Sequence, residues 1–435
     1  MSSRTDPAAL RRAADRFGTP LYVTDLATLA AAAAEVCAAF PDPWLRHYSV
    51  KANDVPAIIA VIAGHGFGAN VVSRGEWAAA ARAGLPNREI TLEGIGKTAA
   101  DLRAAAEAAR DGRPLRWVAL ESPDEAAALA TIVRGVAGRD ASLDVLYRLN
   151  PDVVPETLPG LAVGAGGSKF GMNETELSAA IEAGGGENGP LRPRGIHLHV
   201  GSQLGAVDAW RDGVRRALAV TALWRGSIGT FDTLDVGGGF PVFASGEPAP
   251  GPARFARELP AMLDASPGDR RPARLAIEPG RFLVARAGWL VASVLHARDR
   301  GGRQVVLDAG MTELIRPALY GARHPVVALT SLGRACDVEL LGAARSAEPS
   351  MAPTRVEGPI CETTDSLGVH DLPPLRRGDL VAIADAGAYG ASQSSSYNGR
   401  PRPAQILLEP DGSLRVGRRR SITGFGAGSR IGGSQ

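Results

Sequence analysis

Apolar and polar residues follow one another along this chain in blocks that alternate between helix and strand periodicity. A helical pattern over residues 8–17 is followed by a short apolar strand at 20–24 and a second helical pattern at 26–40. From residue 44 onward, eight apolar or alternating runs are separated by Ala-, Glu- and Arg-rich helical stretches. These runs predict eight strands, at 44–50, 68–72, 89–92, 115–120, 143–149, 195–200, 231–236 and 274–277.

Eight strands that are each followed by a helix or a loop favour a closed (β/α)₈ barrel, the TIM barrel of α/β proteins. A doubly wound open sheet is the alternative. The unusual residues of the chain favour the barrel, because they lie at or just after the C-terminal ends of the strands, which meet at one mouth of a barrel. These residues are Lys51, Ser73, Arg148–Asn150, His199–Ser202, Gly237–Gly239 and Glu278–Arg281.

The pattern changes after about residue 290, where short β-like runs replace the alternation of strands and helices. The runs lie at 289–296, 304–307, 325–329, 337–341, 380–384 and 405–408. The sequence therefore predicts four parts. They are an N-terminal segment (1–40) whose strand joins the β-domain, a barrel (41–288), a C-terminal β-domain (289–420) and a flexible tail (421–435).

The composition narrows the class of protein. The 48 basic and 46 acidic residues are interspersed and leave a net charge of +2, so we expect no nucleic-acid partner. No apolar run reaches the length of a membrane span, and the N-terminus carries no signal-peptide pattern. Three cysteines, an odd and sparse set, indicate a reducing compartment. We therefore expect a cytoplasmic globular protein that does not bind membranes.

Lysine is rare in this chain. Among the 48 basic residues only Lys51, Lys97 and Lys169 are lysines, and the others are arginines. Lysine, unlike arginine, can lose its proton when desolvated and attack a carbonyl group. Lys51 ends an apolar strand, so covalent chemistry and chance survival of a lysine are both open on this observation alone. We expect Lys97 and Lys169 to be structural charges or charges at the rim.

Three glycine-containing loops follow strands of the expected barrel. Gly237–Gly239 exposes backbone N–H groups that can bind an oxyanion, although for this run alone a tight turn between strand and helix is the favoured explanation. Gly201–Ser202 and Gly280–Arg281 follow two other strands, and three such loops at one mouth suggest a phosphate. Glu278 ends the last barrel strand, where its carboxylate could hold a proton on a heterocyclic nitrogen or form a structural ion pair.

Two histidines lie two residues apart on one expected strand and so share a face. His199 is nearer the mouth, and we expect it to form one wall of a pocket for a flat ligand. We expect His197 to be a packed residue of the barrel, and we expect no metal site, because no third ligand is evident at a suitable spacing. A reactive lysine, a phosphate cradle, a buried carboxylate and a stacking histidine together describe a site for pyridoxal 5′-phosphate (PLP).

At these residues the chain resembles the fold-type III PLP-dependent decarboxylases, which share the alanine racemase/ornithine decarboxylase-like fold, and among them most closely the diaminopimelate decarboxylases. The resemblance covers roughly residues 18–420. Its motifs are Ser49–Asn53, His199–Gln203, Gly237–Gly239, Glu278–Arg281, Arg316–Tyr320, Gly358–Glu362, Asp385–Gly390 and Ser396–Asn398.

The resemblance implies a barrel plus a β-domain, assembled as a homodimer with shared active sites. It assigns Lys51 as the residue that joins the cofactor aldehyde, His199 as the residue that stacks on the ring, and Glu278 as the partner of the pyridine nitrogen. It implies that the phosphate is bound by Ser202, Gly239, Gly280 and Tyr389. It implies that the far end of the substrate is held by Arg281, Arg316, Tyr320 and Glu362. Cys361 of the partner chain would be the proton donor.

The implied activity is decarboxylation of meso-diaminopimelate to L-lysine, a step of lysine biosynthesis. Decarboxylation of a carrier-bound or modified amino acid in a natural-product pathway is an alternative, which would add a carrier protein as partner. A racemase and a non-catalytic PLP-binding relative are further alternatives, but the chain keeps Lys51 and Cys361. Two departures bear on the choice: Asn70 stands where the family usually has aspartate, and residues 158–164 replace a His-Pro-Tyr-type segment.

Overall fold

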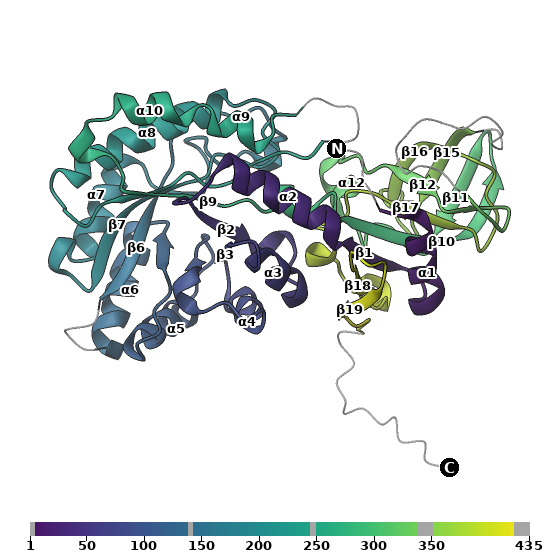
Figure 1. Cartoon of the computed structure of the whole chain (residues 1–435), viewed down its shortest axis with the longest axis horizontal. Coiled ribbons are helices and arrows are strands. Elements are labelled where there is room, and N and C mark those ends of the chain that lie inside the picture. The colour runs from purple at the N-terminus through teal and green to yellow at the C-terminus, as the bar shows by residue number, and fades with distance from the viewer. Residues whose placement is uncertain (1–4, 138–141, 244–248, 337–350, 422–435) are drawn as a thin grey trace, which may run out of the picture. The chain divides into compact units, whose positions relative to one another are not determined.

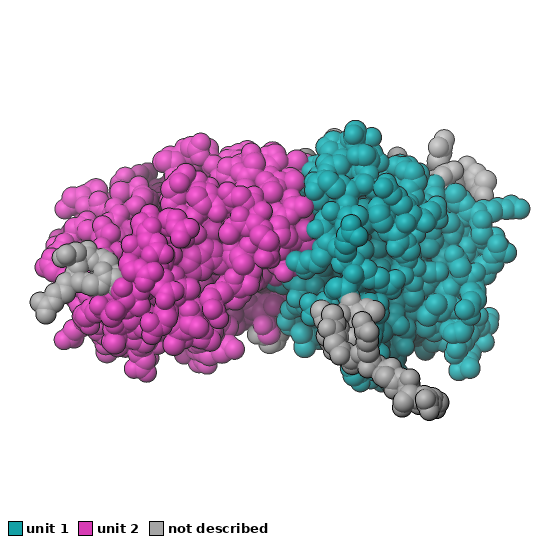
Figure 2. All heavy atoms as spheres, turned by 90° about the horizontal axis from the view of Figure 1, so that it is seen from below, with its two compact units in different colours: residues 1–29, 244–247, 284–435 teal, residues 30–243, 248–283 magenta. Residues whose placement is uncertain are grey.

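The computed structural model describes residues 5–137, 142–243, 249–336 and 351–421, and the chain forms two compact units. The barrel unit comprises Ala30–Phe243 and Pro248–Leu283. The β unit comprises Met1–Leu29, Ala244–Glu247 and Val284–Gln435. Figure 1 labels the elements of each unit, and Figure 2 colours the barrel unit magenta and the β unit teal.

Eight parallel strands close into a barrel, as the pattern of apolar runs predicts. Closure is made by the first and last barrel strands, where Leu45 pairs with Ala276 and Arg46 with Ile277. The open-sheet alternative is therefore wrong. The strands are β2 (Leu45–Ser49), β3 (Gly68–Val71), β4 (Ile90–Leu92), β5 (Trp117–Leu120), β6 (Leu143–Leu149), β7 (Leu191–Leu198), β8 (Thr233–Asp235) and β9 (Arg274–Ile277).

Helices follow the barrel strands (Figure 1), and the longest connections come after β6 and β8. Polar N-caps fix several of the starts: the Ser73 side chain accepts a hydrogen bond from the Glu76 amide, and Thr98 forms a capping box with Asp101. The helices of this part are α2 (Leu26–Ala39), α3 (Pro56–Ala63), α4 (Arg74–Arg82), α5 (Ala99–Arg110), α6 (Pro123–Ala137), α7 (Glu174–Ala183), α8 (Asp208–Arg225), α9 (Pro252–Ala256), α10 (Leu259–Ala265) and α11 (Arg281–Val284).

The β unit is built on a nine-stranded mixed sheet. Its N-terminal strand β1 (Leu21–Asp25) lies between β10 (Gly288–Asp299) and β18 (Ala404–Leu408), antiparallel to the first and parallel to the second. The remaining strands are β11 (Arg303–Leu307), β12 (Val326–Ala328), β15 (Ala352–Glu357), β16 (Ser366–Leu372), β17 (Leu380–Ile383) and β19 (Leu414–Arg418). Two short helices, α1 (Pro7–Phe17) and α12 (Arg316–Tyr320), belong to the same unit.

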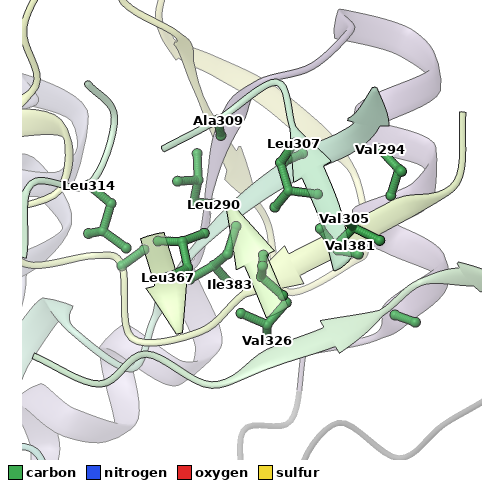
Figure 3. Packing of buried hydrophobic residues seen from close by; sticks show 14 of the residues in the cluster. Leu290, Val294, Val305, Leu307, Ala309, Leu314, Val326, Leu367, Val381 and Ile383 are labelled. Atoms are coloured by element: carbon green, nitrogen blue, oxygen red, sulfur yellow. The ribbon is translucent and has the colours of Figure 1, made fainter. Parts of the chain in front are cut away.

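Both faces of the central β-unit strands are buried. On β10, Leu290 and Val294 belong to one apolar cluster, which Figure 3 shows with Leu307 and Ile383. The intervening Val291 belongs to a second cluster, packed with residues of α1. This alternation follows from the two-residue period of a strand, and it makes β10 the centre of the unit.

Five strands of the β unit escaped the sequence prediction: β13 (Thr330–Ser331), β14 (Arg334–Ala335), β15, β16 and β19. The first two are only two residues long, β15 and β16 bury one face in part, and β19 has no buried residue, so none shows the apolar run that marks a central strand. The strand expected at 337–341 and the tail at 422–435 lie outside the described residues. Among the residues that the structure does describe, no helix has the length and apolar character needed to cross a membrane.

Candidate active site at the barrel mouth

Lys51 lies directly after β2, in the single helical turn Val50–Ala52. The flanking Val50 and Ala52 are fully buried and anchor the turn, whereas Lys51 is exposed. The Ser49 amide donates to the Pro279 carbonyl at 3.1 Å, which ties the end of β2 to the loop after β9. The lysine is therefore held at the mouth beside the strand end that carries Glu278.

The Gly237–Gly239 loop is required by close packing of the backbone. A Cβ atom on Gly237 would lie 2.2 Å from the Leu198 carbonyl oxygen, and one on Gly238 would lie 2.2 Å from that of Glu278. The Glu278 amide donates to the Gly237 carbonyl at 2.9 Å. The tight-turn interpretation thus accounts for these glycines, and the loop also brings the ends of β7, β8 and β9 together.

A cation, a hydroxyl group and a glycine converge next to this loop. The Arg281 guanidinium lies at hydrogen-bond distance from Ser202 Oγ, with Nη2 at 3.2 Å and Nε at 3.4 Å. A Cβ on Gly239 would lie 2.6 Å from the Gly201 carbonyl oxygen, so the two loops touch. Gly280 packs equally closely on Ser49. This arrangement of donors suits an anion such as a phosphate group.

His199 is partly exposed, and the glycine loop fixes its ring. The Gly238 amide donates to His199 Nδ1 at 3.3 Å, so Nδ1 is the acceptor and the proton of the neutral ring is on Nε2. Burial, together with the nearby Lys51 and Arg148, holds the pKa of His199 well below its usual range. The ring is therefore neutral at physiological pH and is suited to stack on a flat ligand.

Below these groups lies a buried polar cluster of four side chains, Asn70, Glu93, His197 and Glu278, which we call the carboxyl cluster. Asn70 Nδ2 donates to Glu93 Oε2 at 2.8 Å and also to Glu278 Oε1. His197 Nε2 lies 3.3 Å from Glu93 and 3.4 Å from Glu278. The four residues come from β3, the end of β4, β7 and the end of β9, so only the closed barrel assembles them.

Burial is the main cause of the pKa shifts in this cluster. It lowers the pKa of His197 to about 4, so this ring is neutral at pH 7. Burial and the neighbouring Glu278 raise the pKa of Glu93 to about 8. The same causes, with Glu93 added, raise the pKa of Asp235 well above its usual range. The site thus contains more carboxyl groups than negative charges at neutral pH.

Glu93 and Asp235 are site residues that the sequence reasoning missed. Each lies at the C-terminal end of an apolar strand, which is the signal that led to Glu278. His197 is buried, as expected of a packed residue, but it also faces two carboxyl groups. Those groups come from other strands, so spacing along its own strand could not reveal them.

The other two lysines are engaged elsewhere in the barrel unit. Lys97 Nζ lies 3.0 Å from Glu125 Oε1, and its side chain is 0% exposed, so it is a structural ion pair. Lys169 lies 5.3 Å from the centre of the Phe170 ring. Neither contact belongs to the carboxyl cluster, which leaves Lys51 as the lysine placed to react there.

The remaining predicted residues lie in the β unit, in two groups. The buried Arg316 guanidinium lies over two aromatic rings, at 5.6 Å from Tyr320 and 6.0 Å from Tyr389. The exposed Cys361 has Asn398 Nδ2 at 3.8 Å from its sulfur. Glu362, next in the chain, raises the pKa of Tyr397 through a hydrogen bond. Their roles toward a substrate stay predictions.

A buried carboxylate anchors the loop that carries Cys361. Asp365 accepts hydrogen bonds from the Met311 amide at 2.6 Å and the Ile360 amide at 2.7 Å. A Cβ on Gly358 would lie 2.1 Å from the Asp365 carboxylate, so only glycine fits there. The thiol is thus exposed on a loop whose base is rigidly held.

Comparison with known proteins agrees with this geometry. Residues 26–285, more than half of the chain, match the family model of the pyridoxal-dependent decarboxylases, pyridoxal binding domain. The diaminopimelate decarboxylase of Aquifex aeolicus is 33% identical over 416 residues, 95% of this chain and 91% of that protein. The diaminopimelate decarboxylase of Deinococcus radiodurans is 36% identical over 404 residues, 92% of each chain.

Among solved structures, the diaminopimelate decarboxylase of Helicobacter pylori, complexed with L-lysine, superposes with a TM-score of 0.82. It is 28% identical in sequence, and the match covers 94% of this chain and 96% of that one. The similarity therefore extends over both units and is not confined to the barrel.

Proposed function

The chain belongs to the pyridoxal-dependent decarboxylases, and from this premise we propose that it converts meso-diaminopimelate to L-lysine and carbon dioxide. The family makes it a carboxy-lyase that uses PLP. The substrate is inferred from the relatives, which are diaminopimelate decarboxylases at 33% and 36% identity, one solved relative having L-lysine bound. The observation that carries the proposal is the meeting of Lys51, Glu278, His199 and the Ser202–Arg281 pair at one barrel mouth.

The residues at the mouth fit PLP, which when bound provides the electron sink for breaking the bond between Cα and its carboxylate. Lys51 supplies an amine beside the carboxyl cluster, and it would hold the cofactor aldehyde. Glu278 would face the pyridine nitrogen, and His199 would cover one face of the ring. Arg281 and Ser202, beside Gly239 and Gly280, would hold the phosphate, with Tyr389 as the further predicted contact.

The far end of the substrate is assigned to the β unit. Arginine forks bind carboxylates through two parallel hydrogen bonds, and Arg316 is held between aromatic rings that fix its direction. Glu362 supplies a negative charge suited to an ammonium group. A substrate with both a carboxylate and an amine beyond the reacting carbon, as in diaminopimelate, satisfies both residues, and Tyr320 would line the same subsite.

We propose further that the enzyme is a homodimer in which Cys361 serves the second copy of the chain, by donating a proton to Cα after carbon dioxide has left. The exposure of Cys361, which forms no disulfide, supports this role. A thiol that must stay reduced is consistent with a cytoplasmic enzyme.

The test is substrate specificity of the purified, PLP-loaded protein. We expect carbon dioxide release from meso-diaminopimelate, with lysine and ornithine as poor substrates, because neither offers a carboxylate at the far end. Arg316→Ala should reduce kcat/KM for diaminopimelate by on the order of a hundredfold, since a charged hydrogen-bonding partner is lost. Equal turnover of lysine, or an unaffected Arg316→Ala variant, would contradict the proposal.

One observation favours a second candidate, decarboxylation of a carrier-bound or modified amino acid. The segment 158–164, which departs from the family pattern, pairs with the loop that carries Ser202: Ala162 bridges Gly201, and the Ser202 amide donates to the Leu161 carbonyl at 3.2 Å. A changed segment at this place could admit a larger substrate. Release of carbon dioxide from a carrier-bound amino acid, but not from free diaminopimelate, would favour this candidate.

A further inference from the structure

We propose that Glu93 is a positioning residue for Glu278, acting as a neutral carboxylic acid that hydrogen-bonds to the Glu278 carboxylate and holds it toward the cofactor ring. The inference rests on the proposed role of Glu278 opposite the pyridine nitrogen. It adds a residue and a protonation state that the family resemblance does not supply.

The contacts of the carboxyl cluster leave little freedom to Glu278. Asn70 Nδ2 donates to Glu278 Oε1 and to Glu93 Oε2, so one amide group holds both carboxyls. One side-chain ligand atom from each of Glu93, His197 and Glu278 lies within 4.8 Å of the others, so the two carboxyl groups are close neighbours. Glu93 is 3% exposed and Glu278 is 7% exposed, so water does not solvate either group well. Two carboxyl groups this close together in a buried site favour a state in which one of them carries a proton.

The charges around Glu93 and Glu278 favour the presence of one proton on this pair of carboxyl groups. Two ionised carboxylates in one buried site repel each other strongly, and the nearest candidate counter-ion, His197, is neutral because burial lowers its pKa to about 4. Lys51 offers only partial compensation, and Asp235 adds a further acid. The groups that act on Glu93 are Glu278 on β9, His197 on β7, Asn70 on β3, Trp117 on β5, Lys51 after β2 and Asp235 on β8.

Glu93 is the carboxyl group that holds the proton. It is the more deeply buried of the pair, and its pKa is raised to about 8 by burial first and by Glu278 second. Glu278 ends β9 at the mouth, where an anion is needed to face a pyridine nitrogen. A protonated Glu93 therefore donates to Glu278 and leaves the negative charge where the cofactor would use it.

Asn70 belongs to the same arrangement. The family usually carries aspartate at this position, but an aspartate cannot donate to two carboxyls and would add a third one to the cluster. The amide of Asn70 and the acid of Glu93 therefore depend on each other. Asn70→Asp alone should weaken PLP binding. The double variant Asn70→Asp with Glu93→Gln moves the amide group from position 70 to position 93, and it should recover most of the lost affinity.

The closing experiment makes the same chemical change on both partners. Glu93→Gln keeps the shape and a hydrogen-bond donor, so the variant should bind PLP within about threefold of the native protein. Glu278→Gln removes the charge and should weaken binding by on the order of a hundredfold. Glu93→Ala removes the donor and leaves a cavity, so its PLP affinity should fall roughly tenfold or more, with thermal unfolding measured to show that it is folded.

Infrared spectroscopy of the protein without PLP tests the proton directly. At pH 7 the native protein should show buried, protonated carboxyl absorption, and the share that is lost as the pH rises past about 8 should be missing from Glu93→Gln, whereas the contribution of Asp235 should remain. The proposal is overturned if Glu93→Gln leaves this absorption unchanged, if it binds PLP as poorly as Glu278→Gln, or if the purified protein holds a stoichiometric divalent ion in place of the proton.

These measurements use no substrate, so they separate this inference from the proposed reaction. If no amino acid is decarboxylated while Glu93→Gln and Glu278→Gln differ as expected, the reaction is wrong and the role of Glu93 stands. If diaminopimelate is decarboxylated while the two variants behave alike, the reaction stands and the role of Glu93 is wrong.

Discussion

The two groups of candidate site residues are built in opposite ways. In the barrel unit, Glu278 is buried in a polar cluster whose members fix one another through hydrogen bonds. In the β unit, Cys361 is exposed, and only the base of its loop is fixed, through Asp365. A group that must hold a permanent charge against a cofactor benefits from a dry, preorganised environment, whereas a group that must deliver a proton must be reached. Under the proposed roles, the burial of Glu278 suits a residue that faces the cofactor, and the exposure of Cys361 suits a residue that serves a second chain.

The largest effect is expected at Lys51, which is exposed although it belongs to the barrel-unit group. Lys51→Ala should reduce turnover on the order of a thousandfold or more, because Lys97 is held in an ion pair with Glu125 and Lys169 lies beside Phe170, so neither is placed to replace it. Borohydride treatment of the native holoprotein should attach the cofactor to the peptide that contains Lys51, as peptide mass analysis would show. Attachment at Lys97 or Lys169 would contradict the assignment.

The proposed role of Cys361 toward a second copy of the chain can be tested with heterodimers of two variants. Homodimers of Lys51→Ala and of Cys361→Ala should both be nearly inactive. If Cys361 serves the second copy, heterodimers of the two variants should recover about half of the native activity, since one of the two sites is intact. Absence of recovery, after subunit exchange has been verified by mass spectrometry, would mean that each chain supplies both residues to its own site.

Asp365 tests whether the exposed thiol depends on its buried anchor. Asp365→Ala leaves the Met311 and Ile360 amides without their acceptor and should lower the free energy of unfolding by about 2–3 kcal/mol, measured by urea denaturation. The exposed neighbour Thr364→Ala is the control and should change it little. PLP affinity should be unchanged in both variants, and a loss of affinity in Asp365→Ala would show that the two groups are not independently built.

The smallest expected effect, when counted per pH unit, is a pH dependence of stability that originates in Glu93. The folded protein holds the Glu93 proton up to about pH 8, whereas an unfolded chain loses it near the ordinary pKa of 4.5. The folded state therefore binds the extra proton between these values, so this group lowers stability as the pH rises across that window, by at most about 1.4 kcal/mol per pH unit. Unfolding of the PLP-free protein from pH 5 to 8 should show a shallower decline in Glu93→Gln. Parallel curves would contradict the assigned protonation.

The sequence predicts the barrel well because its strands are buried on both faces and appear as continuous apolar runs. It also identifies Lys51 and Glu278, which stand out as charged residues at the ends of such runs. The sequence is a poor guide to strands that pair with distant segments of the chain. Strands β15 and β16 bury one face only in part, and their own residues do not indicate which strands they pair with. Glu93 has the same local signal as Glu278, but its significance depends on Asn70 and His197, which only the closed barrel brings near.

Because the barrel closes only with its last strand, the cofactor site can be completed only late in the synthesis of the chain. Asn70 and Glu278 are 208 residues apart in the chain, and Lys51 precedes both. During synthesis the amine that would hold the cofactor emerges early, and its carboxylate counterpart emerges only with the last barrel strand, when β9 can pair with β2. A nascent chain that stops before β9 has Lys51 but lacks Glu278, the residue proposed to face the pyridine nitrogen. Retention of PLP should therefore report completed barrel closure, and chains truncated before residue 278 should emerge colourless.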